Sequence, residues 1–135
     1  MGGKLFMNLK KIGILMLTLA MFLGTTAYAS AEYEKQNSTY NGHTITSILN
    51  CDFSLFGNDR GTATTSWNGM KGYNVSVILF SQANIASKYK ALSSTKGHEK
   101  AVATGSKAGV WQFKSQHYVW DKKGEKHNVC VMTDW

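Results

Sequence analysis

Cys51 and Cys130 are the only cysteines in the sequence, and such a pair suits a disulfide, a reactive thiol or a metal site. Neither residue belongs to a Cys-x-x-Cys motif, and two thiolates alone cannot close a zinc site. In an oxidising compartment a lone pair usually forms a disulfide. We therefore predict a Cys51–Cys130 bridge, which would close a loop of roughly 80 residues and stabilise the fold by about 4.5 kcal/mol.

The four histidines are His43, His98, His117 and His127, and no two have His-x-His or His-x-x-x-His spacing. A C-terminal hairpin that closes around Lys123 would make His117 and His127 diagonal neighbours on one face. A slip of one residue in the register would separate them. Exposed strand histidines are the simpler interpretation, so the sequence predicts no metal site and no cofactor.

The sequence also lacks the short motifs that mark an enzyme. Gly105-Ser106-Lys107 is not the Gly-x-Ser-x-Gly elbow of a serine hydrolase. The glycines at 69 and 72 do not stand between a strand and a helix, as a phosphate-binding loop requires. A disulfide would remove the thiol that a Cys–His nucleophile pair needs. We therefore predict no enzymatic activity.

Aromatic and basic side chains in the C-terminal third are the candidates for binding a partner. Exposed tryptophans bind sugars, peptides or membranes, and lysines draw a protein towards anionic surfaces. The predicted contact residues are Trp111, Trp120 and Trp135, with Lys114, Lys122 and Lys123 around them.

Alternating polarity predicts the strands that must position these residues. From residue 43 to 55, every second side chain is predicted to face the core, with Cys51 among them. Further strands are predicted at 62–67, 73–80, 100–105, 110–120 and 127–133. The last two form a hairpin around the turn at 121–125. Residues 82–94 suit either one short helix or a strand and a loop, because Ile85, Tyr89 and Leu92 recur at intervals of four and three.

These elements predict an all-β fold: a small antiparallel β-sandwich or barrel of six to seven strands, with at most one short helix. Residues 1–31 have the parts of a secretory signal peptide, namely early lysines, an apolar run at 12–23 and small residues near 27–31. The apolar run is too short to span a bilayer. Polar residues 32–42 are predicted to be a flexible arm, and 43–135 a single β domain.

Removal of residues 1–31 leaves 12 Lys and Arg residues against eight Asp and Glu residues, a net charge of about +4. This charge is too small and too scattered for nucleic acid, but it favours attachment to anionic polymers. The signal peptide predicts a secreted, extracellular protein with no stable membrane span after signal removal, and its lysines and strongly apolar run indicate a bacterial origin.

Ala108-Gly109-Val110-Trp111, followed by a β-rich tail that ends on Trp135, resembles the C-terminal part of the lactococcin-type secreted bacteriocins. These are unmodified bacteriocins that block cell-wall synthesis through lipid II. The resemblance covers residues 108–135. It implies a signal peptide, a short basic mature chain and a β-sandwich fold.

The function that we predict is binding of a cell-envelope component, either a wall polymer or a wall precursor, and a bacteriocin-like growth inhibitor is one member of this class. One alternative is a small secreted hydrolase of wall or extracellular polymer, with His117 or His127 beside Asp121 or Glu125 as the acid or base. The other alternative is a β-module that binds another secreted or surface protein through a free strand edge.

Overall fold

The computed structural model describes residues 28–134. Trp135 and residues 1–27, which make up most of the predicted signal peptide, lie outside the described residues. The described chain forms eight strands: β1 (Tyr28–Tyr40), β2 (His43–Ser54), β3 (Asn58–Trp67), β4 (Asn74–Gln82), β5 (Lys90–Gly97), β6 (Lys100–Ala108), β7 (Gln112–Trp120) and β8 (Lys126–Asp134).

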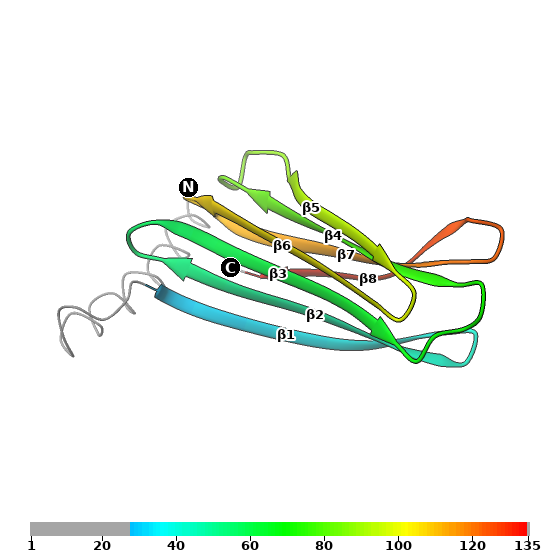
Figure 1. Cartoon of the computed structure of the whole chain (residues 1–135). Helices are drawn as coiled ribbons and strands as arrows, with labels where there is room; N and C mark the ends of the chain where they lie inside the picture. Colours follow the sequence, from blue (N-terminus) through cyan, green and yellow to red (C-terminus); the bar gives the residue numbers. More distant parts are fainter. Residues whose placement is uncertain (1–27, 135) are drawn as a thin grey trace.

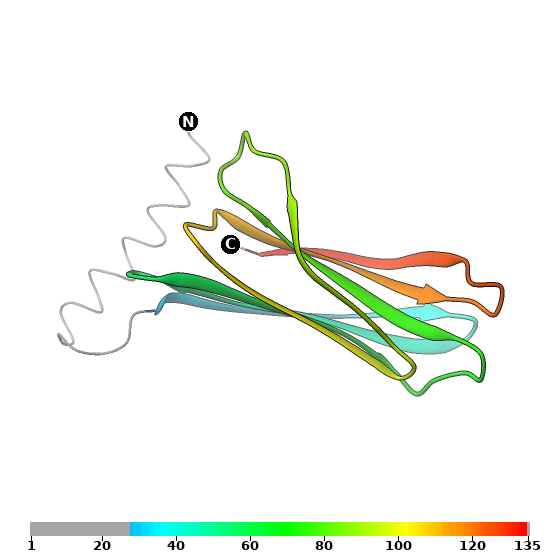
Figure 2. The same ribbon diagram turned by 45° about the horizontal axis from the view of Figure 1, so that its top comes forward.

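The strands form two antiparallel sheets packed face to face (Figures 1 and 2). Sheet A has the order β1-β2-β3-β6, and sheet B has the order β5-β4-β7-β8. The connection between the consecutive strands β5 and β6 passes from sheet B to sheet A along one edge of the sandwich. Strands β1 and β8 lie at the opposite edge. The prediction of a small all-β antiparallel sandwich is therefore confirmed, with eight strands instead of six or seven.

The predicted flexible arm at 32–42 is wrong, because most of it belongs to strand β1, which pairs with β2 along its whole length. Asn41 and Gly42, with φ of 49° and 77°, form the tight turn between the two strands. The positions of β1 that lie opposite the inward residues of β2 are polar, such as Gln36 opposite Ser47. Because both faces of β1 carry polar residues, its sequence lacks the alternation of polar and apolar residues that marks a strand.

Residues 82–94 contain no helix in the described structure, so the alternative of strand and loop is the one that forms. The chain leaves β4 at Gln82 and enters β5 at Lys90. The Gln82 side-chain amide donates to the carbonyl of Ser87 at 2.7 Å and holds the intervening loop. Ile85, which the helical alternative placed on one face with Tyr89 and Leu92, is 60% exposed.

The inward side chains of the two sheets meet in one apolar core. The rings of Phe53 in sheet A and Phe113 in sheet B lie 5.6 Å apart. Gly61 and Gly105 pair across β3 and β6, and a Cβ on them would lie 2.8 Å from Phe113 and 2.9 Å from Leu92. The paired glycines therefore make room for large side chains of sheet B. Other fully buried side chains are Ile45, Leu49, Cys51, Ala63, Val75, Val77, Leu79 and Val119.

The predicted Cys51–Cys130 disulfide is not formed in this structure, where both cysteines are free and buried. The two residues face the core from opposite sheets, but they lie at different positions along the strand direction. Cys130 Sγ donates to Gln36 Oε1 at 3.2 Å, and Gln36 lies opposite Ser47. Ser47 precedes Cys51 by four residues, or about 13 Å along a strand. A disulfide requires Cα atoms within about 7 Å, so β8 would have to slide along β2 to form one.

Burial raises the pKa of both thiols above their usual value. For Cys51 the negative charges of Asp134 and other carboxylates add to this effect. Because the thiolate is the reactive form of cysteine, both residues are poor nucleophiles and behave as core residues.

His117 is fully buried, which corrects the interpretation of the histidines as exposed. Thr65 Oγ1 donates to the Ser76 carbonyl and lies 2.7 Å from His117 Nδ1. His117 Nε2 lies 2.8 Å from the Ser115 hydroxyl. A neutral ring that donates through Nδ1 and accepts at Nε2 satisfies all these groups. Burial lowers the pKa of His117 from 6.5 to about 4, so the ring stays neutral near pH 7.

This lowered pKa predicts that the protein loses stability between about pH 6.5 and pH 4. The unfolded chain takes up a proton at His117 near pH 6.5, whereas the folded chain takes it up only near pH 4. At pH 4.5 the loss amounts to roughly 2–3 kcal/mol. Urea unfolding at pH 7 and 4.5 tests this. His117→Gln should remove that part of the pH dependence, and His43→Gln should keep it. An unchanged pH dependence in His117→Gln would contradict the assignment.

Candidate functional site

Lysines and aromatic rings lie together on the outward face of sheet B. We call this surface the aromatic–lysine face, and it consists of Lys96, Lys114 and Lys126 with Phe80, Tyr89 and Trp120. The ring of Tyr118, which is only 9% exposed, lies beneath Lys126. Alternation along β7 directs Phe113 and His117 to the core and therefore Lys114, Tyr118 and Trp120 outward.

Two lysines lie over the ring of Trp120 at one end of this face. Lys96 Nζ is 4.0 Å from the ring centroid, and Lys126 Nζ is 5.8 Å away. Lys126 Nζ also lies 4.5 Å from the ring of Tyr118. The register accounts for these contacts, because Lys126 pairs directly with Trp120 and Lys96 pairs with Ser76. The Trp120 indole N–H donates to Ser76 Oγ at 2.7 Å, which fixes the orientation of the ring.

The third lysine lies over two other rings at the far end of β7. Lys114 Nζ is 4.4 Å from the ring of Tyr89 and 5.1 Å from that of Phe80. Tyr89 reaches the sheet from the loop before β5, and its hydroxyl donates to Gln112 Oε1. Lys114 and Trp120 are six residues apart on one strand, or about 20 Å. The face is therefore long enough to hold several units of an extended polymer.

Charge is divided unequally between the sheets. The strands of sheet A carry four acidic and four basic residues, whereas those of sheet B carry four lysines and the single carboxylate of Asp134. Asp134 is buried at 7% exposure, so it does not offset the lysines at the surface. The lysines of sheet B are Lys90, Lys96, Lys114 and Lys126. The aromatic–lysine face thus has a net positive potential, and it favours anionic ligands.

A shallow groove of about 310 Å³ opens beside Trp120 on this face. Ser76 and Ser94 add hydroxyl groups to its wall, and Lys96 and Lys126 lie at its border with the Trp120 ring. A sugar ring can stack on the indole while its hydroxyl groups bond to these side chains. The lysines can pair at the same time with a phosphate or carboxylate on the same ligand.

The predicted contact residues fall into different places. Trp120 and Lys114 belong to the aromatic–lysine face, and their role in binding stays a prediction. Trp111 is only 7% exposed, so it belongs to the interior and is wrong as a contact residue. Lys122 and Lys123 are exposed in the turn between β7 and β8, and Lys122 Nζ lies 6.0 Å from the ring of Tyr73, which is not part of the face. Trp135 lies outside the described residues.

Sequence reasoning missed the partners that come from neighbouring strands. Lys126 had a signal, since a hairpin centred on Lys123 pairs residue 126 with Trp120. Lys96 had none, because β5 was not predicted as a strand and its register with β4 shifts between Leu79 and Phe80. Phe80 had one, since alternation along the predicted strand at 73–80 places it on the face opposite to Val77 and Leu79. The β-bulge between His117 and Tyr118 likewise could not be predicted.

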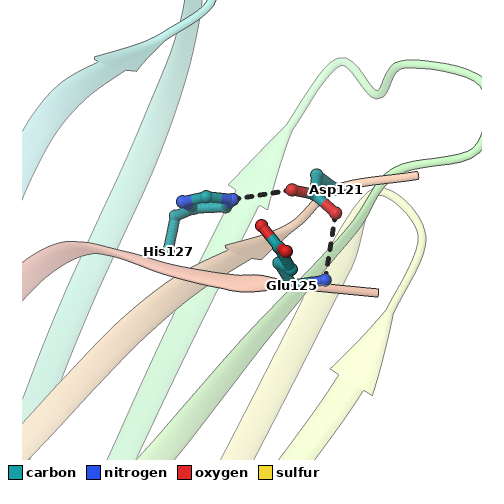
Figure 3. A group of neighbouring side chains, drawn as sticks. All are labelled: Asp121, Glu125 and His127. Carbon is teal, nitrogen blue, oxygen red and sulfur yellow. Dashed lines mark hydrogen bonds and ion pairs between the residues drawn. The ribbon is translucent and has the colours of Figure 1, made fainter. Parts of the chain in front are cut away.

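The turn between β7 and β8 brings together a second group, Asp121, Glu125 and His127 (Figure 3). His127 Nε2 lies 2.8 Å from Asp121 Oδ2. The hydrogen bonds of Asp121 with His127 and with the backbone N–H of Glu125 lower the pKa of this carboxyl. The hydrolase alternative anticipated this pair, but His117 is in a separate, buried network and does not join it.

Within the described part of the chain, no helix has the length and apolar character needed to cross a membrane. Comparisons with protein families, with characterised proteins and with solved structures found no match for this chain.

Proposed function

We propose that this protein is a secreted, non-enzymatic binding module whose aromatic–lysine face binds a sugar- and phosphate-bearing component of a bacterial cell envelope. The observation that carries the proposal is the placement of lysines over aromatic rings on a face without an exposed carboxylate. Such a surface offers a stacking platform and cationic partners at the same place.

The lysine contacts cover the aromatic rings of the face before a ligand binds. Each ammonium group covers a ring and gains a modest cation–π attraction of about 0.5–1 kcal/mol at an exposed site. An anionic ligand pairs with the ammonium groups more strongly and draws them aside, which uncovers the ring for stacking. Trp120, Lys96 and Lys126 have this arrangement beside the groove.

Wall polymers that carry phosphate and the wall precursor lipid II both combine sugars with anionic groups, so both suit this chemistry. Lipid II would also agree with the resemblance of residues 108–135 to lactococcin-type bacteriocins. Sheet A is a weaker candidate for binding an anionic ligand, because its strands carry equal numbers of acidic and basic residues.

The test is binding of the protein, secreted from its full-length gene and purified without a tag, to isolated bacterial cell walls and to vesicles with or without lipid II. We expect saturable binding whose affinity falls as salt screens the lysines but which persists through the stacking contact. Preference for walls or for lipid II vesicles identifies the source of the ligand. Absence of saturable binding to both would overturn the proposal.

A further inference from the structure

We propose that Asp121, Glu125 and His127 form a divalent-cation site in the turn between β7 and β8 and that its preferred ion is Zn²⁺. Each residue offers one ligand atom, and the three atoms lie within 4.8 Å of one another. In Figure 3 the carboxyl groups of Asp121 and Glu125 lie close to the ring of His127. This site is separate from the aromatic–lysine face and does not depend on the proposed function.

The donor set points to zinc. One imidazole nitrogen with two carboxylate oxygens is a common ligand set for Zn²⁺, whereas Ca²⁺ and Mg²⁺ prefer oxygen alone. Tetrahedral ligands bound at about 2.0–2.1 Å lie roughly 3.3 Å apart. The distance of 2.8 Å between Asp121 and His127 needs a small opening, and the exposed Glu125 side chain can rotate inward. A fourth position remains for water.

The turn holds Asp121 in place before any ion arrives. Asp121 Oδ1 accepts hydrogen bonds from the backbone N–H groups of Lys123 at 2.9 Å and Glu125 at 3.0 Å. The backbone N–H of Asp121 donates to the Glu125 carbonyl at 2.9 Å, and that of Gly124 donates to the Asp121 carbonyl at 3.0 Å. Oδ2 is therefore directed towards His127, as expected for a ligand oriented by outer hydrogen bonds.

The imidazole also packs near an aromatic ring. The ring of His127 lies 5.4 Å from the ring of Tyr40, at the end of β1. A cation bound by Asp121 Oδ2 and His127 Nε2 would take the place of the hydrogen between these two atoms, and the neutral ring would then carry its hydrogen on Nδ1. Zinc bound to His127 would thus lie close to Tyr40, a residue of the opposite sheet. Lys122 and Lys123 oppose the ion's charge, so we expect weaker binding than in a zinc-finger site.

Calorimetric titration of the tag-free, chelator-treated protein with ZnCl₂ tests the site. We expect one Zn²⁺ per chain, a higher melting temperature with zinc, and weaker binding to Mg²⁺. His127→Gln and Glu125→Gln should each weaken zinc binding by about tenfold or more. His98→Gln is the matched control, because it removes a histidine next to Glu99 in another turn. No zinc binding, or equal loss in His98→Gln, would overturn the proposal.

Discussion

Trp120→Ala should weaken binding to cell walls or lipid II vesicles by at least about tenfold, a cost of about 1.4 kcal/mol or more. The substitution removes the indole that borders the groove and takes away the ring beneath Lys96 and Lys126. Tryptophans in such positions often contribute 2 kcal/mol or more to an interface. Trp120→Phe keeps a stacking ring and should retain part of the affinity. The measurement is a binding isotherm at fixed salt.

The control for this prediction is Tyr33→Ala, which removes a 62% exposed aromatic side chain from sheet A. It should bind as the unmodified protein does. Thermal melting of each variant shows whether the fold persists, since the Trp120 indole also bonds to Ser76. Equal affinity of Trp120→Ala and the unmodified protein would remove Trp120 from the binding surface.

Asp59→Ala should destabilise the fold by about 4 kcal/mol, a large part of the stability of a domain of this size. Asp59 is 2% exposed. Its Oδ1 accepts from the backbone N–H of Ser54, and its Oδ2 accepts from that of Val110, each at 2.7 Å. The carboxylate thus links the connection between β2 and β3 to the segment before β7. Alanine would remove the acceptor from both donors, and each loss costs about 1.5–3 kcal/mol.

Urea unfolding gives this value directly from the midpoint and slope. Asp59→Asn should also destabilise, because an amide has one acceptor oxygen for two donors. Asp52→Ala is the control, since Asp52 is a half-buried carboxylate on the outer face of β2, and it should cost less than about 1 kcal/mol. A loss below 1 kcal/mol in Asp59→Ala would show that these hydrogen bonds contribute little.

Sequence pattern predicted the fold best where one side of a strand is apolar. Strand β2 has an uninterrupted period of two, and its predicted inward residues Ile45, Leu49 and Cys51 are fully buried. Strand β1 was missed because its positions opposite those residues are polar, although Asn41-Gly42 marked the hairpin turn. Strand β5 was missed because it is an edge strand whose side chains are mostly polar and exposed, so no alternation of polar and apolar residues marks it.

The candidate site was predictable only in part, for a similar reason. Trp120 and Lys114 follow from alternation along β7. Lys96 joins them through the pairing of β5 with β4, and such pairing depends on tertiary structure. In the sequence Trp111 cannot be told apart from Trp120, because both are tryptophans in a β-rich segment. Trp111 is buried, since its backbone N–H donates to the Gln82 carbonyl and holds it against the sandwich. The cysteine pair suggested a disulfide, but Cys51 on β2 and Cys130 on β8 lie at different positions along the strand direction, which keeps the two thiols apart.

The most direct test of the central claim compares two triple variants in the wall-binding assay. Lys96→Gln, Lys114→Gln and Lys126→Gln together remove three charges from the aromatic–lysine face. Lys35→Gln, Lys100→Gln and Lys107→Gln remove three exposed charges from the strands of sheet A, so both variants have the same net charge. We predict that the first variant loses saturable binding and the second retains it. Equal loss in both would show that only overall charge matters, and retained binding in the first would contradict the assignment of this face.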